Sequence, residues 1–144
     1  MPRQPRTLLG DGIFHVTGRG VARMVIYRDL DDFSQFVKLL GAVVLRFRWR
    51  RHAYCLMPNH FHLVLESTRC DLSDGMHRLN GLYAQSFNHR YERSGHLFQN
   101  RFGARLIEDD RQLTTVCAYV LDNPVRAGLT PTAEDWPWSS AREA

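Results

Sequence analysis

The chain has 144 residues, a net charge of +4 and a single lysine, Lys38, so nearly all of its positive charge is arginine. Its length predicts one domain, residues 1–144, and the lack of a long apolar run or of a signal peptide at MPRQPR predicts a cytoplasmic protein without a membrane partner. The three cysteines are widely spaced and odd in number, which excludes a disulfide framework and CxxC zinc spacing. The many arginines, together with aromatic residues, indicate either a protein that binds nucleic acid or a genome rich in G and C.

The first part of the chain predicts a strand and then a helix. Residues 12–18 (GIFHVTG) alternate between two faces, as a strand does, and the glycines of GRG then break the pattern. An acidic start at Asp29 is followed by apolar residues at helical spacing, which predicts a helix over residues 30–44.

Two β-rich runs, residues 48–57 and 59–66, predict an antiparallel hairpin, because Met57-Pro58-Asn59 between them has turn chemistry. In the first run, Arg48 and Arg50 alternate with aromatic residues. This pattern gives either a basic strand edge for a nucleic-acid backbone or an ordinary solvated charged face.

The second run carries two histidines, His60 and His62, on alternate residues. Side chains two apart on a strand point to the same face, with Cα atoms about 6.5–7 Å apart, a separation that suits two ligands of one metal ion. A lone histidine on a half-buried strand is more often a packing residue, and the same applies to His15 on the first strand. Glu66, in phase with the pair, fits either a second-shell acid that orients an imidazole or a surface charge at the strand end.

The second half of the chain predicts two more helices around a short strand. Apolar residues recur every three or four positions from 72 to 87, after a possible cap at Asp71 or Ser73. The pattern at 102–107 predicts the last strand, and Asp109 opens a third helix. This order predicts an α+β, ferredoxin-like (split βαβ) fold, a four-stranded antiparallel sheet with an additional C-terminal helix.

The additional helix carries Tyr119 and Asn123 one turn apart, so their Cβ atoms are expected about 5–6 Å from each other. Asn123 precedes Pro124, which predicts that the helix ends or kinks there. Without the histidines, a packing tyrosine and a helix stop would explain both residues.

Five segments together resemble a known family: FHVTGRG, AYCLMPNHFHLVLES, GHLFQNRFGARLIED, YVLDNPVRAGL and WPWSS. The chain is similar to the single-tyrosine transposases of the HUH class, most closely to the REP-associated tyrosine transposases, from about Gly12 to Ser140. The resemblance implies a metal-dependent endonuclease and strand transferase that acts on single-stranded DNA, often a hairpin such as a repetitive extragenic palindrome, through a 5′-phosphotyrosine link. It also favours a monomer over a dimer.

The same resemblance implies a role for each residue of the site. His60 and His62 would hold a divalent ion, Mg²⁺ or Mn²⁺, and Asn123 would complete the site where insertion-sequence relatives usually have Gln. Tyr119 would be the nucleophile. A phenol is mostly protonated at neutral pH, so it needs a nearby cation to become the phenolate.

Contacts with the DNA backbone are expected from seven arginines and one glutamine: Arg3, Arg6, Arg19, Arg23, Arg48, Arg50, Arg101 and Gln99. Gln99 and Arg101 belong to a family motif that usually has glycine at the position of Asn100. Two other functions stay open, a DNA-binding regulator of such repeats without catalysis, and a small metallohydrolase that uses the histidines with Glu66.

Overall fold

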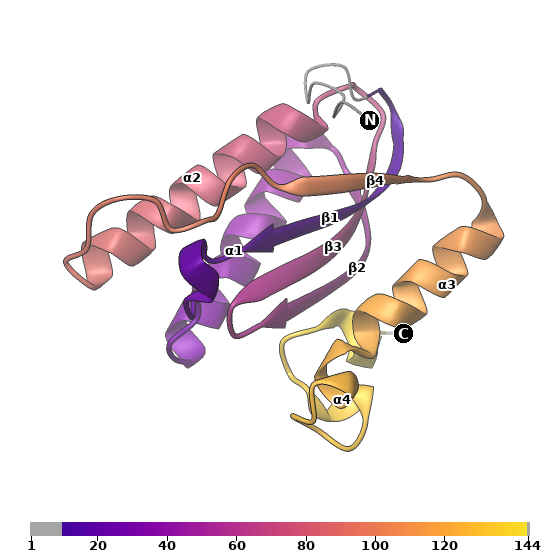
Figure 1. Ribbon diagram of the computed structural model, residues 1–144. Helices are drawn as coiled ribbons and strands as arrows, with labels where there is room; N and C mark the ends of the chain where they lie inside the picture. Colours follow the sequence, from indigo (N-terminus) through magenta and orange to yellow (C-terminus); the bar gives the residue numbers. More distant parts are fainter. Residues whose placement is uncertain (1–9, 144) are drawn as a thin grey trace.

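The computed structural model describes residues 10–143 (Figure 1). Two of the expected DNA contacts, Arg3 and Arg6, lie outside the described residues. Within the described part of the chain, no helix has both the length and the apolar character needed to cross a bilayer.

Four strands form one antiparallel sheet in the order β2-β3-β1-β4. In chain order the main elements are β1 (Gly12–Arg19), α1 (Leu30–Phe47), β2 (Arg50–Met57), β3 (His60–Ser67), α2 (Leu72–Arg90), β4 (Gly103–Ile107), α3 (Asp110–Leu121) and the one-turn α4 (Asn123–Arg126). Three 3-10 turns lie at Val21–Arg23, Ala133–Asp135 and Ser140–Glu143. The predicted α+β class, the four-stranded antiparallel sheet and the extra C-terminal helix are confirmed.

The helices cover both faces of the sheet, but unequally (Figure 1). Helices α1 and α2 pack on one face over a large core that includes Phe61, Leu63 and Leu65 of β3. Helix α3 packs on the other face, against β2 and β3, through a smaller cluster that includes Val64 and Val120. Because side chains alternate along a strand, His60 and His62 fall on the α3 side of β3.

Helix α1 is longer than predicted. It begins after Asp29, whose carboxylate accepts a hydrogen bond from Asp32 N at 3.0 Å, and it ends at Arg48, which has a left-handed φ of 56°. Phe47 therefore ends a helix and stacks on Trp49 at 5.5 Å between ring centroids, instead of alternating along a strand. The predicted strand start at residue 48 is wrong by two residues, because this packing overrides the local β pattern.

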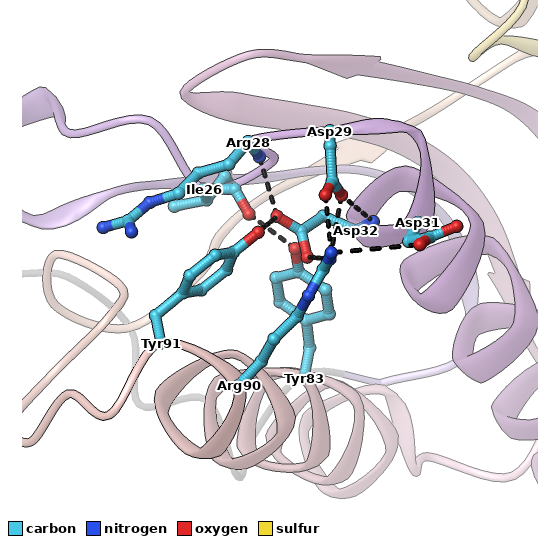
Figure 2. A network of polar contacts seen from close by, with 8 residues as sticks. All are labelled: Ile26, Arg28, Asp29, Asp31, Asp32, Tyr83, Arg90 and Tyr91. Atoms are coloured by element: carbon cyan, nitrogen blue, oxygen red, sulfur yellow. Dashed lines mark hydrogen bonds and ion pairs between the residues drawn. The ribbon is translucent and has the colours of Figure 1, made fainter.

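A polar network centred on the buried Asp32 joins the start of α1 to the end of α2 (Figure 2). Asp32 is 3% exposed, and its carboxylate accepts hydrogen bonds from Arg90 at 2.6 Å, Tyr91 Oη at 2.6 Å and Arg28 N at 2.8 Å. Arg90 also pairs with Asp29. A buried carboxylate is tolerated because these donors replace the water it has lost.

The C-terminal segment covers the outer edge of β2. Leu56 N donates to Trp138 O at 2.8 Å, and Tyr54 N donates to Ser140 Oγ at 2.9 Å. Trp136 Nε1 donates to Leu56 O at 2.9 Å. The edge strand β2 thus has hydrogen-bond partners along this stretch, which protects it from pairing with another chain.

Candidate active site

His60 and His62 lie side by side on β3, with ring centroids 5.2 Å apart. In the sheet His60 is opposite Arg19 of β1, and His62 is opposite Thr17 of β1 and Cys55 of β2. Phe61 between them is fully buried on the other face. The prediction that the two imidazoles share one face is confirmed.

Each imidazole of the pair has one ring nitrogen engaged by a neighbour. His60 Nδ1 lies 2.7 Å from Asn59 Oδ1, and because that oxygen can only accept, Nδ1 carries the proton. His62 Nδ1 lies 2.9 Å from His15 Nε2. When His62 Nδ1–H donates this bond, the Nε2 atoms of both His60 and His62 keep a free lone pair for a metal ion.

Burial keeps these imidazoles neutral. Burial, followed by smaller electrostatic contributions from His15, His60, Arg126 and Arg19, lowers the pKa of His62 to about 3. Burial, assisted by Arg19, also lowers the pKa of His60, and burial with Arg105 lowers that of His15. The neutral imidazole is the form that binds a metal ion.

Tyr119 on α3 faces this group of imidazoles. Its ring centroid is 6.3 Å from that of His62 and 6.5 Å from that of His15, both edge to face. The side chain is 52% exposed, whereas the next residue, Val120, is fully buried against the sheet. Val120 thus anchors the helix against the sheet, while Tyr119 stays half exposed.

Asn123 lies one residue beyond Asp122, which separates α3 from α4, so the predicted helix end before Pro124 is confirmed. Its amide Nδ2 donates to Val120 O at 3.2 Å, and its Oδ1 accepts from Arg126 Nη2 at 3.0 Å. Within residues 10–143, Asn123 makes no hydrogen bond to the imidazoles, so its role as the third ligand stays a prediction.

Arg126 is a residue of the site that the sequence reasoning missed. Its guanidinium carbon lies 3.9 Å from the centroid of the Tyr119 ring, and Nη1 donates to Tyr119 O at 2.9 Å. Together with the bond to Asn123, these contacts link the tyrosine and the amide through one side chain. The signal was present, since positions 119, 123 and 126 follow helical spacing.

A cavity of about 370 Å³ opens beside the histidine pair, and we call it the histidine cavity. Its lining residues are Thr17, Gly18, Arg19, His60, His62, Gln99, Asn100, Arg101 and Gly103. Three expected DNA contacts, Arg19, Gln99 and Arg101, thus gather around the two histidines. Asn100 has a left-handed φ of 52°, a conformation that Asn adopts more readily than most residues, which fits a position where the family usually has glycine.

The other expected DNA contacts lie elsewhere. Arg50 begins β2 opposite Glu66, at the end of the hairpin remote from His60, and Arg48 caps α1 next to it. Arg23 is exposed in the turn after β1 and does not line the histidine cavity. The strand register therefore separates Arg48 and Arg50 from the histidines.

Two alternatives were open for Glu66. The one in which its carboxylate orients the ring of His60 or His62 is wrong. Glu66 Oε1 lies 2.9 Å from His52 Nε2 of the neighbouring strand. Four residues along β3 separate Glu66 from His62, or about 13 Å, so being in phase does not bring them into contact. His15 instead engages His62 from the adjacent strand.

The donors present fit a divalent ion with open coordination positions. Two imidazole nitrogens and an amide oxygen suit Mn²⁺ or Zn²⁺ well, and Mg²⁺ less well because it prefers oxygen ligands. Among residues 10–143, no three His, Cys, Asp or Glu side chains form a complete metal-binding group. With two imidazoles and one amide as its protein ligands, an ion held here would keep positions for water or phosphate oxygens.

Comparisons with known proteins identify the family of the chain. The family model described as "Transposase IS200 like" matches residues 15–123. A Haemophilus influenzae protein named as a REP-associated tyrosine transposase is 32% identical over an alignment of 100 positions, which covers 61% of this chain and 56% of that protein. The aligned part thus spans little more than half of that relative's length.

Two solved structures share the fold. A REP-associated tyrosine transposase bound to a REP hairpin has a TM-score of 0.81 at 18% identity, over 99% of this chain and 84% of that chain. A protein of Deinococcus radiodurans named as a transposase has a TM-score of 0.56 at 16% identity, over 83% of this chain and 95% of that chain. Because the family model matches residues 15–123, well over half of the chain, the chain belongs to the IS200-like transposase family.

Proposed function

We propose that the chain is a metal-dependent endonuclease and strand transferase for single-stranded DNA, with Tyr119 as its nucleophile. The observation that carries this proposal is the position of the accessible Tyr119 ring 6.3 Å from His62, beside a histidine pair with ring centroids 5.2 Å apart. The relative solved with a REP hairpin supports a DNA hairpin as the substrate class. A cytoplasmic monomer is part of the same proposal.

His60 and His62 would hold a divalent ion, Mn²⁺ or Mg²⁺, with Asn123 as the third ligand. The bound ion would polarise the scissile phosphate as a Lewis acid and favour the phenolate. His15 and Asn59 would hold the imidazoles in the orientation that presents Nε2. Asn123 Oδ1 now accepts a hydrogen bond from Arg126. To bind the ion, this oxygen must either give up that hydrogen bond or use one lone pair for Arg126 and the other for the ion.

Tyr119 would attack the phosphorus of a phosphodiester. The phenol loses its proton, a bond forms between its oxygen and phosphorus, and the bond from phosphorus to the 3′ oxygen breaks. The departing oxygen takes a proton and becomes a 3′-hydroxyl, while the 5′ side stays joined to Tyr119. One phosphodiester replaces another, so a 3′-hydroxyl can reverse the step and rejoin a strand.

Arg19, Gln99 and Arg101 would hold the phosphates on either side of the cut. All three line the histidine cavity. Arginine binds phosphate through two parallel N–H donors, which gives orientation as well as charge neutralisation. Binding of the strand should therefore weaken as salt rises.

The test uses labelled single-stranded hairpin DNA with Mn²⁺ and a denaturing gel. The proposal predicts a covalent adduct that disappears in Tyr119→Phe and persists in Tyr54→Phe. Tyr54 is the matched control because it lies on β2 and faces the side of the sheet away from α3. Binding without any adduct would identify a non-catalytic DNA-binding regulator. Cutting that survives Tyr119→Phe would indicate a metallohydrolase.

The metal site is tested by replacing both histidines with alanine. Cleavage should be abolished while DNA affinity stays largely unchanged, because the arginines that bind the backbone are intact. A large loss of thermal stability with retained cleavage would show that His60 and His62 are packing residues.

A further inference from the structure

Helix α3, which carries Tyr119, is held on the sheet by less burial than the other long helices. Of its residues, all of which the structure describes, only Val120 is buried, whereas α1 has five buried residues. Leu113, Val116 and Cys117 of α3 are only partly buried against the small cluster. The position of Tyr119 therefore depends also on how the chain that follows α3 is attached.

The chain after α4 returns to the sheet as residues 136–140, which we call the clasp. It holds one residue of β2, Leu56, through two hydrogen bonds. Leu56 N donates to Trp138 O at 2.8 Å, and Leu56 O accepts from Trp136 Nε1 at 2.9 Å. Both backbone hydrogen-bonding groups of Leu56 are thus bonded to the clasp.

This attachment lies directly across the sheet from the histidine pair. In the register of β2 with β3, Leu56 is opposite Phe61, the residue between His60 and His62. The clasp therefore joins the chain that follows the nucleophile to the part of the sheet that carries the expected metal ligands.

The Trp136 ring connects the two cores of the protein. It packs against the large core and also against the small cluster that contains Val120. Its ring meets Phe33 of α1 edge to face, at 6.1 Å between centroids. Between α3 and Trp136 the chain folds back on itself, with Leu129 N donating to Pro124 O at 2.8 Å. Because this connection is short and folded, a shift of Trp136 would displace α3 as well.

We propose that Trp136 is a positioning residue for the nucleophile and sets, through the clasp, the distance between Tyr119 on α3 and the histidines on β3. This inference rests on the proposed function. Attack on phosphorus requires close placement of the phenol oxygen, and a misplacement of about 1 Å can lower a rate about 100-fold. If the clasp only covered the edge of β2, no particular distance between α3 and β3 would be needed.

Trp136→Phe is the main test of this proposal. Phenylalanine keeps a ring between the two cores but has no N–H group for Leu56 O. Trp49→Phe is the matched control, because it is the same change and also removes one indole hydrogen bond, from Trp49 Nε1 to Asp71 Oδ1 at 2.9 Å. Trp49 is buried in the large core and precedes the end of β2 that is remote from His60.

Two measurements separate positioning from stability. Hydrogen–deuterium exchange of the α3 amides, in the free protein without metal or DNA, should become about 2- to 10-fold faster in Trp136→Phe, as expected for one lost hydrogen bond. The single-turnover cleavage rate at saturating protein, with Mn²⁺ and hairpin DNA, should fall about 3- to 30-fold, while the apparent affinity for DNA changes less than about twofold. Trp49→Phe should lower the unfolding temperature but leave the α3 exchange and the saturated rate within about twofold of the unaltered protein.

A cross-link between the clasp and β2 tests whether the lost position can be restored. Ser139 is the antiparallel partner of Cys55, and such partners have Cα atoms about 4.5–5.5 Å apart, a separation that a disulfide accepts. In a protein with Cys70→Ser and Cys117→Ser, the new thiol of Ser139→Cys can pair only with Cys55. Oxidation with oxidised glutathione should return the saturated rate of Trp136→Phe to within about threefold of that of the same protein with Trp136, and reduction should remove this gain.

Four outcomes would overturn the positioning role: unchanged α3 exchange, an unchanged saturated rate, equal losses in Trp136→Phe and Trp49→Phe, or a rate that the oxidised cross-link does not restore. A Trp136→Phe protein that is unfolded by circular dichroism would also overturn it, because the residue would then support the whole fold. The two proposals fail separately. No adduct with the unaltered protein refutes the proposed function, whereas an adduct that Trp136→Phe forms at the same rate refutes only the role of Trp136.

Discussion

Replacing Arg126 with alanine should slow strand cleavage while leaving the fold intact. Its guanidinium lies 3.9 Å from the Tyr119 ring centroid and donates to Tyr119 O at 2.9 Å and to Asn123 Oδ1 at 3.0 Å. These contacts hold the nucleophile and the expected third ligand relative to each other. Alanine at this position would release both side chains at once.

The size of the effect follows from those three contacts. An exposed cation–π contact contributes about 0.5–1 kcal/mol, and a hydrogen bond contributes about 0.5–1.5 kcal/mol. The Arg126 side chain is 37% exposed, so we take the lower ends and expect about 1–2 kcal/mol in total. If this energy orients Tyr119 for attack, the cleavage rate falls about 5- to 30-fold.

The assay is single-turnover cleavage of labelled single-stranded DNA at saturating and at low protein concentration. The rate at saturation should fall in Arg126→Ala, whereas the apparent affinity for DNA should change less than threefold. Arg126→Lys keeps the charge over the ring but loses the paired donors, so its rate should be intermediate. Arg111→Ala, an arginine loss on the exposed side of α3, serves as the control. An unchanged rate at saturation in Arg126→Ala would refute the positioning role.

Three further predictions concern the fold and the metal site. Asp32→Leu removes a carboxylate that accepts hydrogen bonds from Arg90, Tyr91 and Arg28 N. The free energy of unfolding, measured by denaturant titration, should therefore fall by about 2–4 kcal/mol. A fall of less than about 0.5 kcal/mol would contradict the role of the network. Gly18→Ala would place a Cβ 2.3 Å from the buried Phe61 ring, so it should lower the free energy of unfolding by about 1–3 kcal/mol. Gly41→Ala, where a Cβ would have nothing within 4 Å, should instead stabilise helix α1. Equal effects of the two changes would refute the close contact at Gly18. His15→Phe should weaken Mn²⁺ binding about 10- to 100-fold in isothermal titration calorimetry, because the imidazole it contacts loses its orienting partner, and unchanged affinity would remove His15 from the site.

Much of the fold could be predicted because its signals are local. The alternation of β3 and the turn at Met57-Pro58-Asn59 placed the hairpin within one or two residues. The end of α1 could not be predicted in the same way, since Phe47 stacks on Trp49 and the helix extends to meet it. Strand β1 also runs one residue past its predicted end at Gly18. Gly18 does not interrupt the strand, because its missing Cβ leaves room for the Phe61 ring.

The site was predictable where it depends on one strand and unpredictable where it depends on register. The shared face of His60 and His62 follows from the period of two along a strand. The contact between His15 and His62 depends on how β1 aligns with β3, which no local pattern gives. The alignment of β2 with β3 likewise leaves Glu66 beside His52.

The central claim is that Tyr119 forms a covalent link to DNA. After reaction with single-stranded hairpin DNA and Mn²⁺, trypsin and nuclease digestion should leave the peptide of residues 112–126 carrying a nucleotide. Mass spectrometry with fragmentation should place the added phosphate on Tyr119. An unmodified peptide from a reaction in which the strand has been cut, or a nucleotide on any other side chain, would contradict the account.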